Sequence, residues 1–262
     1  MDALYIAATG MQAQQMAVDT IANNLANVQT PGFKRSGVSF QELMYREIAA
    51  LKPATFSGGT APAANAEYGY GVAATNFAKV FAQGDLRQTD NPLDLAIRGT
   101  GLIEVVLPDG TVGYTRGGSL KVGKDGLITT ALGYALKQSL HVPQDAEQIL
   151  ISPQGGVYVR SARHNTPVEI GQIELVRFLN PDSLSPMGDG LYRRTDSTSE
   201  PLFGKPGEDD LGLLAQGFLE GSNVKMIDEM IALVVAQRAY ESNSKVIQAA
   251  DEMMSMVNGL RR

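Results

Sequence analysis

Residues 4–28, LYIAATGMQAQQMAVDTIANNLANV, place apolar side chains at alternating steps of three and four positions. A helix with this spacing carries a single apolar seam that is shaped to pack against another helix. The seam consists of Leu4, Ala7, Met11, Gln14, Val18, Ile21, Leu25 and Val28, and Gln14 is its one polar member. Gln29-Thr30-Pro31-Gly32 restricts the backbone and supplies a turn. We therefore predict an N-terminal helix that ends near Asn27.

Residues 233–257, LVVAQRAYESNSKVIQAADEMMSMV, repeat the same spacing near the other end of the chain. Two such seams predict that the chain folds back so that its ends pair. Two ordinary core-facing helices in a monomer are the alternative, and the pattern alone does not decide between them. For an assembling protein, the candidate assembly interface is Leu4, Met11, Val18, Ile21, Leu25, Val28, Leu233, Tyr240, Ile247, Met254 and Val257.

The middle of the chain has a different pattern, with short β-branched and apolar runs separated by turns. Runs at 102–107, 119–122 and 127–130 are joined by Pro108-Asp109-Gly110 and Lys124-Asp125-Gly126, which predicts antiparallel hairpins. Runs at 114–116, 149–151, 157–159 and 173–178 extend this pattern. Residues 36–51 have a helical or mixed period, and 180–212 have the composition of loops.

These elements predict an α+β fold, with paired coiled-coil-like N- and C-terminal helices and an inserted antiparallel β-rich domain. The expected domains are a terminal helical assembly domain (1–45 with 213–262), an insertion or linker (46–71) and a β-rich outer domain (72–212). Residues 53–71 are rich in Gly, Ala, Pro and Ser, which predicts a long flexible loop unless something packs on it.

Composition excludes several classes of function. The net charge of −6 gives no bulk attraction to nucleic acid or to anionic membranes. The absence of cysteine excludes disulfides, thiolate metal sites and cysteine nucleophiles. The N-terminus lacks the basic and apolar regions of a cleaved signal peptide, and no apolar run has the length of a membrane span.

The candidate catalytic groups favour structural interpretations. His141 and His164 do not have metal-ligand spacing, and Gly99-Thr100-Gly101 lacks the third glycine of a phosphate loop, so a tight backbone turn is expected there. Asp85, Asp90 and Asp94 could in principle form a carboxylate pair of a hydrolase, but turn and cap roles are expected instead. We predict no catalytic residue, no metal site, no cofactor and no enzymatic activity.

Several stretches of this chain resemble the bacterial flagellar rod and hook protein family, and the resemblance extends over essentially the whole chain. They are residues 21–35 (IANNLANVQTPGFKR), 91–99 (NPLDLAIRG), 114–119 (YTRGGS), 216–224 (QGFLEGSNV), 237–241 (QRAYE) and 243–245 (NSK). The N-terminal family motif comprises Asn23, Asn24, Leu25, Asn27, Thr30, Gly32, Phe33 and Lys34. The length of the chain and the sequence of residues 216–224 resemble those of the distal rod type, and a proximal rod paralogue is the close alternative.

The resemblance implies a structural subunit that assembles with copies of itself into a helical tube. The tube would transmit motor torque to the hook and serve as an export channel. The implied partners are the proximal rod proteins, the hook protein, the surrounding P- and L-ring proteins and the flagellar type III export apparatus, with no nucleic acid. The implied location is the periplasm-spanning rod of the basal body, reached by export without a cleaved signal. A secreted adhesin or filament protein and a periplasmic hydrolase are the alternatives from other classes.

Overall fold

A computed structural model of the chain describes residues 2–43, 45–48, 66–69, 71–161 and 164–259. The chain forms two compact units, each built from segments that lie far apart in the sequence. Unit 1 comprises residues 1–23, 37–77 and 227–262, and unit 2 comprises residues 24–36 and 78–226. The units are described one at a time below.

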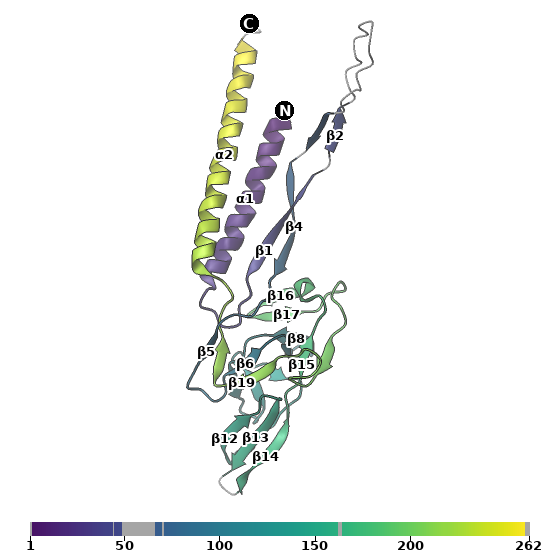
Figure 1. The fold of residues 1–262 in the computed structure, drawn as a ribbon, viewed down its shortest axis with the longest axis vertical. Coiled ribbons are helices and arrows are strands. Elements are labelled where there is room, and N and C mark those ends of the chain that lie inside the picture. Colours follow the sequence, from purple (N-terminus) through teal and green to yellow (C-terminus); the bar gives the residue numbers. More distant parts are fainter. Residues whose placement is uncertain (1, 44, 49–65, 70, 162–163, 260–262) are drawn as a thin grey trace. The chain divides into compact units, whose positions relative to one another are not determined.

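Unit 1 contains most of the two long helices, α1 (Asp2–Ala26) and α2 (Met226–Gly259). The helices lie side by side and run in opposite directions (Figure 1). They approach closely at Gly10, where an added Cβ atom would lie 2.8 Å from the side-chain Nδ2 of Asn243. Two terminal helices are therefore confirmed, and α1 ends one residue before the predicted Asn27. Coiled-coil packing between them stays a prediction.

Unit 1 also contains two pairs of strands. Strand β1 (Ser36–Glu42) pairs with β4 (Val72–Lys79), and β2 (Tyr45–Ile48) forms an antiparallel hairpin with β3 (Ala66–Gly69). Residues 36–42 and 45–48 are thus extended where a helical or mixed period was expected. Val38 and Phe40 are two positions apart, as on one face of a strand. Pairing with β4 stabilises β1, and local spacing does not reveal that pairing. The expected flexible loop 53–71 includes β3, and 49–65 and 70 lie outside the described residues.

Unit 2 is the β-rich unit, and its strands are almost all antiparallel. Its largest sheet has nine strands, with the order β16-β17-β8-β7-β11-β10-β9 and with β15 and β18 attached through β7. The members of this sheet are β7 (Leu102–Val106), β8 (Val112–Thr115), β9 (Leu120–Val122), β10 (Ile128–Thr130), β11 (Ala135–Leu136), β15 (Leu175–Arg177), β16 (Ser185–Gly188), β17 (Leu191–Arg193) and β18 (Leu202–Gly204).

Smaller sheets complete unit 2. A three-stranded sheet has the order β12-β13-β14, and two further pairs are β6 with β19 and β5 with β20. Their bounds are β5 (Leu86–Gln88), β6 (Leu95–Arg98), β12 (Ala146–Ile151), β13 (Gly156–Ser161), β14 (His164–Gln172), β19 (Leu213–Gln216) and β20 (Phe218–Glu220). A 3₁₀ turn, η1 (Pro181–Ser183), precedes β16.

Both predicted Asp-Gly hairpins are confirmed. Strand β7 pairs antiparallel with β8 across the turn at 108–110, and β9 pairs antiparallel with β10 across the turn at 124–126. The expectation of loops throughout 180–212 was wrong, since β16, β17 and β18 lie there. These strands have three or four residues each, and they are stabilised by distant partners such as β8 and β15.

The core of unit 2 is formed by aliphatic side chains that point between the sheets. Its most deeply buried members include Leu95, Ile97, Ile103, Val105, Leu120, Ile128, Leu136, Ile173 and Leu175. Full burial of a Leu, Ile or Val side chain contributes about 1.5–3 kcal/mol. This core fixes the strand ends that carry the polar groups described next. None of the described helices has both the length and the apolar character needed to cross a membrane.

Candidate functional site

A cluster of three buried charged side chains lies within unit 2, where segments 24–36, 78–84 and 217–223 meet. Lys34 comes from the N-terminal family motif, Arg116 follows β8, and Glu220 ends β20. The Nζ of Lys34 lies 2.7 Å from Oε1 of Glu220, and the Nε of Arg116 lies 2.6 Å from Oε2. The residues retain 0%, 4% and 2% of their accessible surface respectively. We call these three residues the junction cluster.

Every member of the junction cluster makes further hydrogen bonds to the backbone. Lys34 donates to the carbonyl oxygen of Ala82 at 2.7 Å, and the N–H of Gly84 donates to Oε1 of Glu220 at 2.9 Å. Burial lowers the pKa of Lys34, the hydrogen bond and charge of Glu220 oppose that shift, and the charge of Arg116 adds to it. Buried charges are tolerated when they are paired and hydrogen-bonded in this way.

Arg116 also organises the turn at 99–101. Its guanidinium donates to the carbonyl oxygens of Ile97, Gly99 and Gly101 at 3.1, 2.5 and 2.6 Å. Gly99 and Gly101 have φ values of +117° and +130°, which side chains with a Cβ rarely adopt. The backbone bends at Gly99, and Arg116 satisfies the carbonyl oxygens of Gly99 and Gly101.

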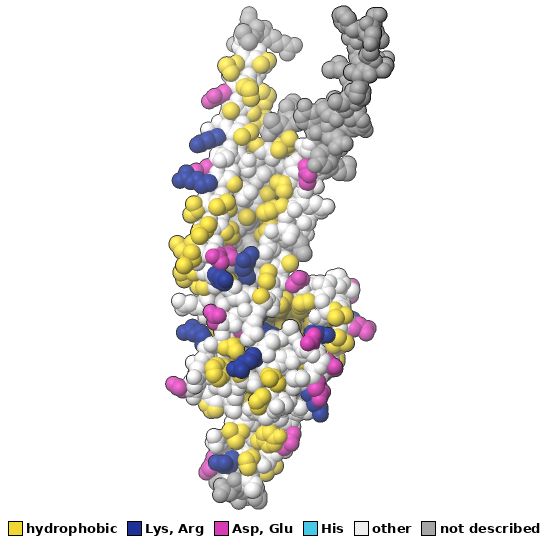
Figure 2. All heavy atoms as spheres, in the orientation of Figure 1, with side chains coloured by type: hydrophobic (Ala, Val, Ile, Leu, Met, Phe, Trp, Pro, Cys, Tyr) yellow, Lys and Arg dark blue, Asp and Glu magenta, His cyan; other side chains and the backbone are white. Residues whose placement is uncertain are grey.

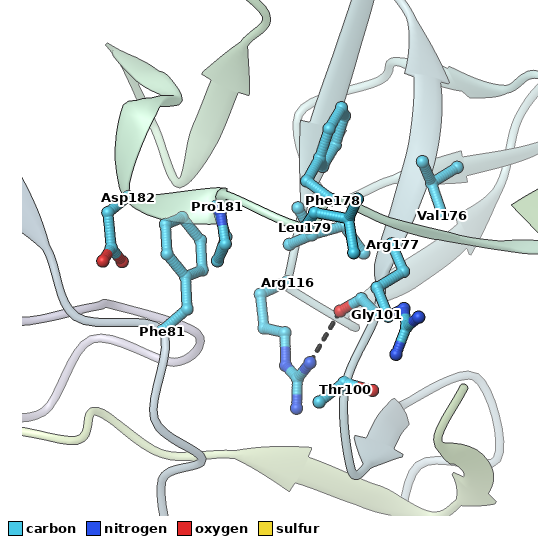
Figure 3. A pocket seen from close by; sticks show the side chains of 11 residues that line it. Phe81, Thr100, Gly101, Arg116, Val176, Arg177, Phe178, Leu179, Pro181 and Asp182 are labelled. Carbon is cyan, nitrogen blue, oxygen red and sulfur yellow. Dashed lines mark hydrogen bonds between the residues drawn. The ribbon is translucent and has the colours of Figure 1, made fainter. Parts of the chain in front are cut away.

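Arg116 lines a cavity of about 410 Å³ (Figure 3). The cavity walls are mainly apolar, with Phe81 and Pro181 on one side and Phe178 and Leu179 on another. Thr100 and Arg177 lie on the far side from Phe81. Tyr192 packs edge-to-face on Phe81, with ring centroids 5.0 Å apart, and burial raises the pKa of Tyr192 to about 12.

The N-terminal family motif surrounds the junction cluster. The side chain of Asn24 donates to the carbonyl oxygen of Ser36 and accepts from its N–H, both at 2.9 Å. Gly32 donates its N–H to the carbonyl oxygen of Glu220 at 2.8 Å, and its φ of +70° and its closeness to the Gly117 backbone explain the glycine. Thr30 bonds to Asn27 in the turn, and the Nζ of Lys79 lies 4.5 Å from the ring centroid of Phe33. Asn23 is exposed and Leu25 is half-buried.

The predicted assembly residues are distributed differently. On α1, Leu4, Met11, Val18, Ile21 and Leu25 are half-buried, and Val28 lies in the turn beyond the helix. On α2, Leu233 and Ile247 are half-buried, whereas Tyr240, Met254 and Val257 are exposed. Their role in assembly stays a prediction.

Sequence reasoning did not assign roles to Arg116 and Glu220, although both lie in stretches that resemble the family. Lys34 and Glu220 are 186 positions apart, so no local spacing connects them. The one available signal was the presence of a single charge inside a motif that is otherwise uncharged, such as Glu220 in 216–224.

The candidate catalytic residues have structural environments. Asp94 accepts hydrogen bonds from Thr89 and Asn91 at 2.8 and 2.9 Å, as a turn residue does. His141 forms an isolated bridge with Leu127, and His164 begins β14. Among the residues that the structure describes, no three His, Cys, Asp or Glu side chains are grouped as a metal would require.

Comparison with known proteins identifies the family. Residues 4–34 match the family described as flagella basal body rod protein, residues 96–159 match the D1 domain of flagellar hook protein FlgE/F/G, and residues 215–260 match the C-terminal region of flagellar basal body rod FlgEFG proteins. The chain is 43% identical to flagellar basal-body rod protein FlgG of Borreliella burgdorferi over 265 residues, covering 100% of this chain and 99% of the relative. The chain belongs to the flagellar rod protein family.

Within the flagellar rod family, the similarity is greater to FlgG than to FlgF proteins of the same organism. FlgG of Caulobacter vibrioides is 41% identical over 261 residues and all of both chains, and FlgF of that organism is 33% identical over 96% of this chain and 94% of the relative. The predicted family and the resemblance to the FlgG type are confirmed. A flagellar rod protein is a structural protein of the basal body that assembles with other rod and hook components.

Proposed function

We propose that the protein is a subunit of the distal rod and that it assembles with copies of itself into a helical tube. The observation that carries the proposal is an apolar face on the first three turns of α2, which consists of Met226, Ile227, Met230, Ile231, Val234 and Val235. Ile227, Ile231 and Val235 retain 72%, 60% and 62% of their accessible surface. Figure 2 shows apolar side chains along this helix.

The opposite face of α2 has a different character. Ala236 and Ala250 are buried, and Asn243 lies against Gly10 of α1. The exposed apolar face is therefore separate from the face of α2 that contacts α1. A contiguous exposed apolar surface on a helix is typical of an interaction site. Burying it against other subunits would contribute about 25 cal/mol for each Å² removed from water.

A contact between two different surfaces of identical subunits generates an open helix when the rotation does not close. Repeated many times, such contacts give a tube that resists twist, which is what torque transmission to the hook requires. In this proposal the terminal segments 1–45 and 213–262 form the assembly domain and 72–212 form the outer domain. The tube interior serves as the export channel.

The proposed partners follow from the same assignment. They are further copies of this chain, proximal rod proteins, the hook protein, the surrounding P- and L-ring proteins and the flagellar type III export apparatus. The proposed location is the periplasm-spanning rod.

A substitution on the exposed face tests the proposal. Ile231→Asp places a charge in the proposed contact, and burial of an unpaired charge costs several kcal/mol. We expect this variant to remain monomeric in sedimentation assays and to fail to restore swimming in a strain that lacks the protein. Gln237→Asp, which adds the same charge at an exposed polar position of α2, is the control. Normal polymers and normal swimming with Ile231→Asp would contradict the proposal.

A further inference from the structure

The junction cluster joins three segments that lie far apart in the sequence. Lys34 belongs to segment 24–36, Glu220 to segment 217–223, and Arg116 to the β-rich part of unit 2. We propose that the cluster is a latch in which the docking of segment 24–36 depends on the docking of segment 217–223. The biological role of the latch rests on the proposed function. The dependence of one docking step on the other is a property of a single chain.

The dependence follows from the charges in the cluster. Two cations share one carboxylate, whose Oε1 is bound by Lys34 and whose Oε2 is bound by Arg116. Without Glu220, burial of Lys34 would place its ammonium group near the Arg116 guanidinium with no anion between them. Burial and the Arg116 charge both lower the pKa of Lys34, while Glu220 raises it. Glu220 is thus the group that makes a buried, charged Lys34 tolerable.

Backbone contacts extend the same dependence along both segments. The Gly32 N–H bonds to the carbonyl oxygen of Glu220 at 2.8 Å, and the Arg35 N–H bonds to Oδ1 of Asn223 at 2.7 Å. Segment 217–223 therefore supplies acceptors on either side of Lys34 in the sequence. Such coupling is reciprocal, because a contact that stabilises one docked segment stabilises the other by the same free energy.

The positions of Lys34 and Glu220 along the chain determine when the latch can close. Any process that delivers the chain from its N-terminus presents Lys34 long before Glu220, which comes 186 positions later. Until Glu220 arrives, segment 24–36 lacks its ionic partner and stays undocked. Segment 24–36 thus docks within unit 2 only on a chain whose segment 217–223 is present.

Trypsin cleavage after Arg35 tests the latch in the full-length monomer. Arg35 is held in the docked state through its N–H and through its carbonyl oxygen, which accepts from Val80 at 2.9 Å. Removing one partner of a buried ion pair is strongly destabilising, so Glu220→Gln should increase cleavage after Arg35 by about 100-fold. Glu241→Gln, which removes an exposed carboxylate paired with Arg238 on α2, should leave the cleavage rate unchanged.

The double variant Lys34→Met, Glu220→Gln separates coupling from simple loss of folding. The double variant removes the uncompensated ammonium charge of Lys34, while Arg116 keeps its hydrogen bonds to the carbonyl oxygens of residues 97, 99 and 101. Protection of Arg35 should therefore recover in part, by at least about 10-fold relative to Glu220→Gln alone. If Glu220→Gln unfolds the whole β-rich unit, the double variant still tests the proposal, because recovered protection of Arg35 from trypsin supports the latch. Unchanged cleavage in Glu220→Gln, or no recovery in the double variant, would overturn it. Failure of the monomer to polymerise affects neither measurement, so the latch and the proposed assembly are tested independently.

Discussion

The side-chain Nδ2 of Asn223 donates a hydrogen bond of 2.7 Å to the carbonyl oxygen of Val80, which lies 143 positions earlier in the chain. The same amide group donates to Ala82 at 3.1 Å, and its Oδ1 accepts from Arg35 at 2.7 Å. One asparagine thus satisfies three backbone groups from two other segments. Its amide is required because the position must both donate and accept.

Asn223→Asp should destabilise unit 2 for this reason. A carboxylate still accepts from Arg35, but it cannot donate, and it would face the carbonyl oxygens of Val80 and Ala82. We expect a loss of about 1–3 kcal/mol in the free energy of unfolding. Urea denaturation followed by near-ultraviolet circular dichroism measures it. Asn258→Asp, at an exposed position of α2, is the control, and an equal effect in both variants would contradict the assignment.

Gly10→Leu should disturb the contact between α1 and α2. Even a Cβ atom at this position would lie 2.8 Å from Nδ2 and 3.3 Å from Cγ of Asn243, so a larger side chain displaces Asn243 or separates the helices. Overpacking of this kind costs about 1–3 kcal/mol. We expect lower helicity by circular dichroism and weaker polymerisation.

The added substitution Asn243→Ala should partly restore both properties in Gly10→Leu, because it removes the atoms that the leucine meets. Gly259→Leu is a control, since among the described residues no atom outside the neighbouring backbone of α2 lies within 4 Å of a Cβ built there. A double variant as impaired as Gly10→Leu alone would show that the defect lies elsewhere than at Asn243.

Tyr192 should make unit 2 sensitive to alkaline pH. Burial raises its pKa from 10.0 to about 12 in the folded state. Between these values the unfolded chain releases the proton while the folded chain keeps it, so stability is complete below pH 10 and falls as pH rises toward 12. Two pKa units correspond to about 2–3 kcal/mol.

Tyr192→Phe should remove that part of the alkaline decrease. The lowered pKa of Lys34 makes the free energy of unfolding rise with pH instead of falling. The quantity to compare is therefore the difference in the free energy of unfolding between this variant and the parent protein. Urea denaturation at about pH 9, 10 and 11, from below the window to its middle, provides it. Tyr158→Phe is the matched control, and parallel curves for Tyr192→Phe and the parent would refute the prediction.

We propose that the insertion 46–71, most of which lies outside the described residues, opposes sliding between neighbouring subunits, and deletion of residues 51–63 tests this role. The β2–β3 hairpin closes at Ile48 and Ala66, so four remaining residues can join the strands. The terminal segments are unchanged, and we expect polymers that are more flexible or curved than those of the parent, because the segment is proposed to oppose sliding between subunits. Electron microscopy of polymer curvature is the measurement. Straight polymers of unchanged stiffness would assign rigidity to the helices alone.

The sequence by itself determined the elements whose signals are local. The seams at 4–28 and 233–257 depend on side chains three or four positions apart, so they predicted α1 and α2. The Asp-Gly turns at 109–110 and 125–126 predicted two hairpins because turn chemistry sets the pairing of adjacent strands. The family could also be predicted, because its motifs are contiguous runs of residues.

The tertiary structure alone decided the strands and charges whose partners are remote. Strand β1 is stabilised by β4, and β17 by β8, although their own residues give weak or mixed signals. Isolated Lys, Arg and Glu side chains are almost always exposed. Lys34, Arg116 and Glu220 instead form a buried cluster, because folding brings segments up to 186 positions apart into contact. A charge can be buried only where a partner and a hydrogen-bonding environment compensate its lost hydration, and that environment is a property of the folded chain.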